Sequence, residues 1–140
     1  MKNDCFFCAI IDGEMPSYKI YEDELFYVIL DRFPKCLGHV LILTKRHAPH
    51  IFALTEAESE QLLPLSQKIA AAMKQALDYE GLNLLQNNGS TAGQEVMHFH
   101  LHLIPRFDGD AMAVQYKRED PEDEAFLEML GKFEAAFANE

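Results

Sequence analysis

One stretch, from Met97 to Pro105, constrains the fold most, because three histidines alternate there with bulky apolar residues. Successive side chains of a β-strand leave opposite faces, so His98, His100 and His102 are predicted to share one face of a strand. A single outward histidine would be ordinary on a half-buried strand. Three in register favour chemistry, since imidazole can act near neutral pH as a nucleophile, a general acid or base, or a metal ligand.

The three histidines are not predicted to bind one metal ion together. Four residues at about 3.3 Å each separate His98 from His102 by roughly 13 Å along a strand. One ion, bound at about 2.1 Å by each nitrogen, cannot easily join both. We therefore expect the three side chains to have different roles.

The length of 140 residues predicts a single domain, residues 1–140, with a core of its own. No apolar run is long enough for a transmembrane helix, and the first residues lack the apolar core of a secretory signal. A cytoplasmic protein is therefore expected.

The chain is strongly acidic, with 12 Lys and Arg against 23 Asp and Glu and a formal net charge of −11. This balance disfavours nucleic-acid duplexes and anionic membrane surfaces as partners, since both need a basic footprint. A small phosphate ligand remains compatible, because local cations and backbone N–H groups can hold one. Lys45, Arg46 and Arg106 are close in sequence to histidines and are candidates for such cations.

Local patterns predict the remaining elements. Aromatic and β-branched runs around a polar turn indicate a hairpin, and the apolar run from His39 to Leu43 indicates a strand central in the sheet. Thr55 and Glu58 form a capping box before a long apolar stripe, in which Pro64 predicts a kink or a break. The predicted segments are strands 18–21, 25–30, 39–43 and 82–86, a helix over 56–79 ended by Gly81, and a C-terminal helix over about 121–138 started by Asp120 and Pro121. The apolar face of that last helix should cover the domain or a partner.

A second chemical signal is the Cys-x-x-Cys motif of Cys5 and Cys8. Taken alone it fits a redox dithiol, half of a zinc site or coincidence, although the βαβ pattern of a redox domain does not surround it. Zinc would need two more ligands, and His47 and His98 would complete a Cys2His2 set. Spacing alone leaves these alternatives open. Cys36 is predicted to be an ordinary small filler.

The loop from Asn87 to Gln94, rich in glycine and small residues, leads into the histidine strand. By itself it fits an ordinary hairpin loop, but its position favours backbone N–H groups that approach an anion such as phosphate. A neutral histidine beside a phosphate can attack phosphorus, provided that one ring nitrogen is free and the other is held as N–H. His100 is best placed for this attack, and His102 could orient the substrate or donate a proton.

The run His98-Phe99-His100-Leu101-His102-Leu103-Ile104, preceded by Gly93-Gln94, resembles the His-φ-His-φ-His-φ-φ signature of the histidine triad (HIT) family, where φ is apolar. Blocks along most of the chain also resemble those of its bacterial members, namely residues 5–11, 13–16, 30–31, 38–42, 45–47 and 87–89. The resemblance implies an α+β domain with an antiparallel sheet of about five strands, one long helix and a C-terminal helix. It also implies pairing into a homodimer.

The same resemblance implies a purine nucleotide as ligand and attack of His100 on its α-phosphate. Position by position, Asp31 would hold the ribose hydroxyls, and Glu95 would face the leaving group. The phosphate region would be contacted by His39, Asn87, Gln94 and His102. Members with the N-terminal motif carry structural Zn²⁺, for which the ligands would be Cys5, Cys8, His47 and His98.

Two departures concern the substrate. Glu95 stands where the best-known eukaryotic branches carry Ser or Thr, and a carboxylate there would alter the preferred leaving group or repel a second phosphate. The chain also has no Trp, so the tryptophan-bearing tail of one branch has no counterpart.

These inferences predict a nucleotidyl hydrolase or transferase. It would cleave a phosphoramidate or a dinucleoside polyphosphate at the α-phosphate, through a nucleotidyl intermediate on His100. The alternative is a nucleotide-binding regulatory or scaffold protein with little turnover. A redox or metal-handling protein built on Cys5 and Cys8 would leave the histidine strand unexplained.

Overall fold

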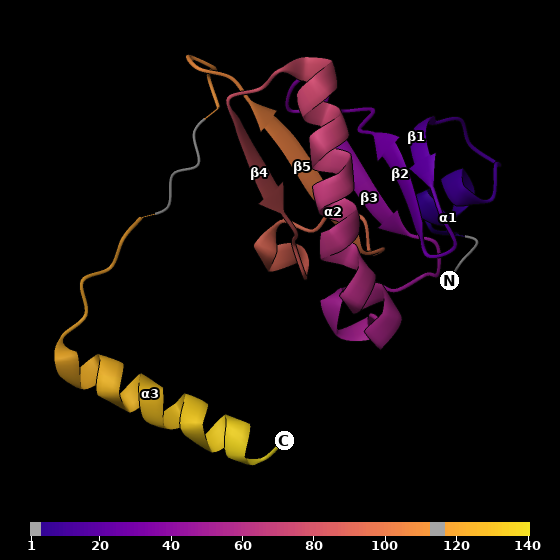
Figure 1. Ribbon diagram of the computed structural model, residues 1–140. Coiled ribbons are helices and arrows are strands. Elements are labelled where there is room, and N and C mark those ends of the chain that lie inside the picture. Colours follow the sequence, from indigo (N-terminus) through magenta and orange to yellow (C-terminus); the bar gives the residue numbers. More distant parts are fainter. Residues whose placement is uncertain (1–3, 113–116) are drawn as a thin grey trace.

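The computed structural model describes residues 4–112 and 117–140, and it contains one five-stranded antiparallel sheet in the order β1-β2-β3-β5-β4 (Figure 1). This architecture confirms the expected α+β fold with its long helix. The strands are β1 (Tyr18–Glu22), β2 (Phe26–Leu30), β3 (Val40–Thr44), β4 (Gly81–Leu85) and β5 (His100–Arg106). The helices are α1 (Phe6–Ile11), α2 (Glu56–Leu77) and α3 (Asp123–Ala138), with short 3₁₀ turns at Ile51–Ala53 and Ser90–Ala92.

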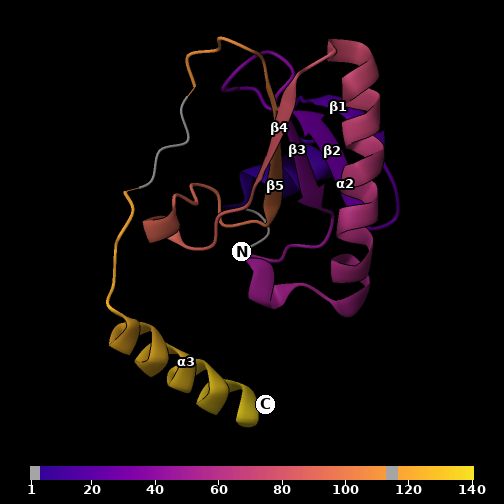
Figure 2. The same cartoon turned by 60° about the vertical axis from the view of Figure 1, so that its left-hand side comes forward.

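The sheet has a helix on each face, and Figure 2 shows α2 on the side opposite α1. On the α2 side, Ile42 and Leu103 pack with Ile69 and Met73 in one apolar core. On the α1 side, a second core joins strand residues to the first helix, and its members are Cys5, Phe7, Cys8, Ile10, Ile29, Leu41 and Leu43. β3 lies centrally, as predicted, and all five of its residues are buried.

Strand register places the histidines on the α1 side. His100 pairs with Leu43 and His102 pairs with Leu41, and antiparallel partners project from the same face of a sheet. The predicted alternation is therefore confirmed for these two histidines. The prediction that the strand already includes His98 is wrong, because the chain bends at residues 96–98 and β5 begins at His100. Ahead of it, the Phe99 N–H donates to the carbonyl of Ala48, outside the sheet ladder.

The long helix begins as predicted and ends differently. Thr55 and Glu58 form the expected capping box. Pro64 does not break α2, and its exposed position lets water satisfy the carbonyl that loses its helical partner. Asp78, in the left-handed conformation at φ 49°, caps the helix and donates its N–H to the carbonyl of Lys74. The predicted end at Gly81 is therefore wrong, and Gly81 opens β4 instead.

α3 stands apart from the sheet in both views (Figures 1 and 2). It begins at Asp123, after Glu122, so the predicted start at Asp120 and Pro121 is wrong by two residues. None of its residues is buried, so its apolar face does not cover the domain. In the part of the chain that the structure describes, no helix has both the length and the apolar character needed to cross a bilayer.

Candidate functional site

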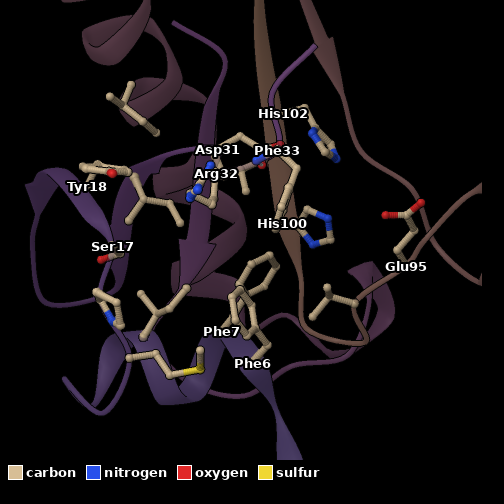
Figure 3. Close-up of a pocket in the computed structure, with 17 residues that line it drawn as sticks. Phe6, Phe7, Ser17, Tyr18, Asp31, Arg32, Phe33, Glu95, His100 and His102 are labelled. Atoms are coloured by element: carbon tan, nitrogen blue, oxygen red, sulfur yellow. Dashed lines mark hydrogen bonds between the residues drawn. The ribbon is translucent and has the colours of Figure 1, made fainter. Parts of the chain in front are cut away.

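A cavity of about 650 Å³ opens on the α1 side of the sheet (Figure 3). The histidine face of β5 forms part of its wall, with His100 and His102 in the lining. Asp31, just after β2, and Glu95, just before the bend, also line it. The rest of the lining is mostly apolar, with Phe7, Ile10, Met15, Tyr18, Ile29 and Leu41 among its members. The cavity thus combines an apolar compartment with a few converging polar groups, as small-molecule sites usually do.

Hydrogen bonding fixes which nitrogen of His100 is free. Its Nδ1 lies 2.7 Å from the backbone carbonyl of His98, and a carbonyl can only accept. Nδ1 therefore carries the hydrogen and Nε2 keeps its lone pair. Burial lowers the pKa of His100, and the side chain is only 7% exposed, so the imidazole is neutral at pH 7. His100 can act as a nucleophile toward a group in the cavity.

A hydrogen bond from His39 gives His102 the opposite tautomer to that of His100. The backbone N–H of Lys35 donates to His39 Nδ1 at 3.0 Å, which leaves the hydrogen of His39 on Nε2. That Nε2 lies 2.9 Å from His102 Nδ1, so His102 accepts there and carries its own hydrogen on Nε2. Burial, with the neighbouring His100 and His39, lowers the pKa of His102 to about 4. The two lining histidines therefore have opposite tautomers, one with a free lone pair and one with a free N–H.

These tautomers can be tested directly. We expect the imidazole ¹⁵N shifts at pH 7 to report Nδ1–H for His100 and Nε2–H for both His39 and His102. In His39→Ala, His102 loses the partner of its Nδ1 and should become a mixture of tautomers. A single Nδ1–H form of His102 in the wild-type protein would contradict the assignment.

The other predicted nucleotide-binding residues lie at different depths. Asp31 lines the cavity, and its Oδ1 accepts from the Phe33 N–H at 3.0 Å. His39 is 1% exposed and lies behind His102. Gln94 is buried and stabilises the loop that ends at this residue, since its Nε2 donates to the carbonyls of Pro49 and Val96. Neither Gln94 nor Asn87 is part of the cavity lining.

The three cationic side chains suggested as phosphate ligands do not line the cavity. Lys45 pairs with Glu22 at 2.6 Å, and Arg46 pairs with Glu58 at 2.8 Å. Arg106 pairs with Asp110 at 2.8 Å. The suggestion that these three side chains hold a phosphate is therefore wrong, since each is engaged by a carboxylate and none lines the cavity.

A second constellation joins the two N-terminal cysteines to His47 and His98, whose ligand atoms all lie within 4.8 Å of one another. Cys5 Sγ lies 3.3 Å from His98 Nδ1, Cys8 Sγ lies 3.4 Å from His47 Nδ1, and the two Nδ1 atoms are 3.2 Å apart. A tetrahedral zinc site with ordinary Zn–N and Zn–S bonds has ligand separations of about 3.3 to 3.8 Å. The four side chains therefore fit Zn²⁺.

The orientation of His98 also suits a metal ligand. Its Nε2 lies 2.6 Å from the carbonyl of Thr44, so Nε2 carries the hydrogen and the Nδ1 lone pair faces the cysteines. A ring held by a carbonyl through its second nitrogen is usual for zinc-binding histidine. Bound zinc would supply a closed structural link between the start of the chain and β3, with no open position for catalysis.

The apolar compartment of the cavity had no counterpart among the predictions. The ring of Phe7 packs against His100 with centroids 5.0 Å apart, and Ile29 and Leu41 lie opposite each other on neighbouring strands. Alternation along the predicted strands could have placed Ile29 and Leu41 on the histidine face once the register was known. No sequence signal indicated that α1 would bring Phe7 there.

Comparison with known proteins agrees with this site. The sequence profile of the HIT domain matches residues 12–109. The chain is 40% identical over 115 residues to Protein hit of Bacillus subtilis, which covers 81% of this chain and 79% of that protein. It is 40% identical over 104 residues to an adenosine 5′-monophosphoramidase of Saccharomyces cerevisiae, covering 74% of this chain and 63% of that protein.

Solved structures show the same fold. A Streptococcus mutans UA159 protein matches with a TM-score of 0.90 at 35% identity, covering 96% of this chain and 86% of that chain. A zinc-bound histidine triad family protein of Mycobacterium smegmatis matches with a TM-score of 0.75 at 34% identity, covering 97% of this chain and 99% of that chain. The profile, the relatives and the histidine face of β5 agree, and the chain belongs to the HIT domain family.

Proposed function

We propose that the protein is a nucleotidyl hydrolase or transferase that cleaves a purine nucleotide conjugate at its α-phosphate. The observation that carries the proposal is the hydrogen bond from His100 Nδ1 to the His98 carbonyl, which leaves Nε2 free in the cavity. A cavity of about 650 Å³ is large enough for a nucleotide. The yeast relative named as an adenosine 5′-monophosphoramidase supports a phosphoramidate as one substrate class.

The reaction would have two steps. In the first, the Nε2 lone pair of His100 attacks the α-phosphorus, and the bond to the leaving group breaks with its electron pair on the leaving group, which takes up a proton from the solvent. In the second, water adds its oxygen to phosphorus and loses a proton, and the N–P electron pair returns to His100. The His102 Nε2–H would donate to a phosphate oxygen, and Asp31 would accept from the ribose hydroxyls.

Mass spectrometry after rapid quenching tests this intermediate. The protein is mixed separately with adenosine phosphoramidate, a dinucleoside polyphosphate and an adenylated lysine. An adenylyl adduct on the peptide that contains His100 would support the enzyme. Tight binding of these compounds with neither adduct nor product would instead support a regulatory nucleotide-binding protein.

The pH dependence follows from the lowered pKa values. His100 must be neutral to attack, and burial lowers its pKa, so it stays neutral as the pH falls below 6.5. We expect kcat/KM to fall less between pH 7.5 and 5.5 than the roughly tenfold that an imidazole of ordinary pKa would lose. The profile should be measured with a leaving group that does not titrate in this range, together with the zinc content at each pH. A bend at pH 6.5 with zinc retained would contradict the prediction.

We also propose that the protein is a homodimer. Four large apolar residues lie on one face of α3 and are more than half exposed, namely Phe126, Leu130, Phe133 and Phe137. An exposed apolar patch of this kind usually marks an interaction surface. The Streptococcus mutans match leaves only 4% of this chain uncovered, so it extends into α3. A helix with no buried residue that is matched in a relative fits contact with a second chain.

Introducing negative charge on the apolar face of α3 tests the dimer. Leu130→Glu with Phe133→Glu should convert the species seen by light scattering from dimer to monomer at micromolar concentration. Ala135→Glu, on the opposite side of the helix, is the matched control and should remain dimeric. A monomeric wild-type protein, or a dimeric double variant, would refute the proposal.

Zn²⁺ is the proposed structural cofactor, supported by the ligand separations and by the zinc-bound Mycobacterium smegmatis relative. The proposed setting is the cytoplasm, because no disulfide joins the three cysteines and disulfides are rare in a reducing compartment.

A further inference from the structure

Glu95 lies at the opposite end of the cavity from the apolar compartment. Figure 3 shows Ser17 and Tyr18 on one side of His100 and the Glu95 carboxylate on the other. The residue is exposed. Within residues 4–112 and 117–140, no hydrogen-bond donor or cation pairs with its carboxylate. Among the described residues, Glu95 thus presents a carboxylate without an ion-pair partner at this end of the cavity.

The layout of the cavity decides which part of a nucleotide conjugate meets this charge. A purine and its ribose fit the compartment lined by Phe7, Ile29 and Leu41, with Asp31 nearby. The α-phosphate would then lie at His100. The substituent on the far side of that phosphate, which is the leaving group, would extend toward Glu95, which lies on that side of His100 in Figure 3.

The remaining charges of the cavity do not offset Glu95. Besides the histidines, the charged residues in the lining are Asp31, Arg32 and Glu95. The guanidinium of Arg32 lies over the ring of Phe33, 5.5 Å from its centroid, and Figure 3 places it beside Asp31. A leaving group that carries further phosphates would meet a like charge at Glu95 with no cation beside it. An ammonium group in the same place would be attracted.

We propose that Glu95 is a specificity-determining residue that selects leaving groups with a positive charge. The preferred substrates would be nucleoside phosphoramidates of amines that carry a second, protonated amino group, and dinucleoside polyphosphates would be poor substrates. This inference rests on the proposed nucleotidyl chemistry and names the substrate class within it. It concerns recognition of the leaving group and assigns no proton transfer to Glu95.

The test uses three adenosine 5′-phosphoramidates of matched size. Their leaving amines are 1,4-diaminobutane, butylamine and 4-aminobutyrate, which carry a positive, a neutral and a negative end at pH 7. Values of kcat/KM are measured for the wild-type protein, Glu95→Gln and Glu95→Lys. The ratio of the diamine to the aminobutyrate compound is taken within each protein, so a general loss of activity cancels.

We expect this ratio to be at least about tenfold in the wild-type protein, within about threefold of unity in Glu95→Gln, and inverted in Glu95→Lys, from Coulomb's law at about 6 Å in a nearly aqueous environment. A ratio that survives Glu95→Gln, or one near unity in the wild-type protein, would overturn the proposal. Because Glu95 is exposed, both variants should fold, and their melting temperatures verify this.

Equilibrium binding tests recognition by Glu95 independently of the proposed cleavage reaction. The same three compounds are titrated into His100→Asn, with and without Glu95→Gln. A diamine preference in binding that disappears with Glu95→Gln would support recognition by Glu95 even if the wild-type protein cleaves none of them. Absence of binding by all three compounds would overturn both proposals.

Discussion

His100→Asn is expected to lower kcat/KM for adenosine phosphoramidate by at least about 10⁴-fold, since the residue would supply the attacking nitrogen. Asparagine is close to isosteric at this position. Its amide nitrogen can still donate to the His98 carbonyl, which His100 Nδ1 reaches at 2.7 Å. The substitution therefore removes the nucleophile while keeping the local hydrogen bond, so the loss can be attributed to chemistry.

The matched control is His50→Asn, because His50 carries the same ring outside the cavity lining. It should retain kcat/KM within about threefold. The adenylyl adduct should disappear in His100→Asn and persist in His50→Asn. A His100→Asn protein that keeps more than a tenth of the wild-type activity would show that another group attacks the phosphate.

Periodicity alone predicted the common face of His100 and His102, because alternation is a local property of a strand. It could not place His98. That residue lies where the chain bends, and its ring meets Cys5 at 3.3 Å across 93 positions of sequence. A long-range contact of this kind overrides the local pattern, so the predicted strand began too early.

The roles of His100 and His102 were predicted, but their opposite tautomers could be assigned only from the three-dimensional structure. The backbone N–H of Lys35 sets the tautomer of His39, and His39 sets that of His102. The sequence shows these residues but not the direction of their hydrogen bonds. The apolar compartment was missed for the same reason, because it forms only when the register and α1 bring Ile29, Leu41 and Phe7 together.

A helix end was predicted correctly where neighbouring residues supply all the capping hydrogen bonds, as at the start of α2. The capping box of Thr55 and Glu58 has both of its hydrogen bonds. The end of α2 depended on Asp78 adopting a left-handed conformation, for which glycine would be the more usual choice. For α3 the amphipathic pattern was right. What its apolar face contacts is not encoded in that pattern, and none of the residues of α3 is buried.

Cys5→Ser with Cys8→Ser is expected to remove the bound zinc and to lower the melting temperature by at least about 10 °C. Two of the four ligands would be lost, and a closed Cys2His2 site contributes several kcal/mol to folding. In a domain of this size, about 3 kcal/mol corresponds to roughly 10 °C. Metal analysis and differential scanning calorimetry of the purified protein measure the two effects.

Cys36→Ser is the matched control, because Cys36 lies outside the cluster and its thiol donates a hydrogen bond to the carbonyl of Pro105. It should keep the zinc and melt within about 2 °C of the wild-type protein. Unchanged metal content and melting temperature in the double variant would refute the structural zinc.

Loss of zinc should also alter the position and the tautomer of His100 in the cavity. His98 offers its Nδ1 to the cluster and its carbonyl to His100 Nδ1, so one residue joins the two sites. Phe7, between the two cysteines, packs against the rings of both His98 and His100. When the cluster loosens, His100 should lose its fixed tautomer and its apolar neighbour together. We therefore expect the double variant, assayed well below its melting temperature, to show a lower kcat and mixed His100 tautomers in its ¹⁵N spectrum. Unchanged kcat and tautomer in a zinc-free protein would show that the two sites are independent.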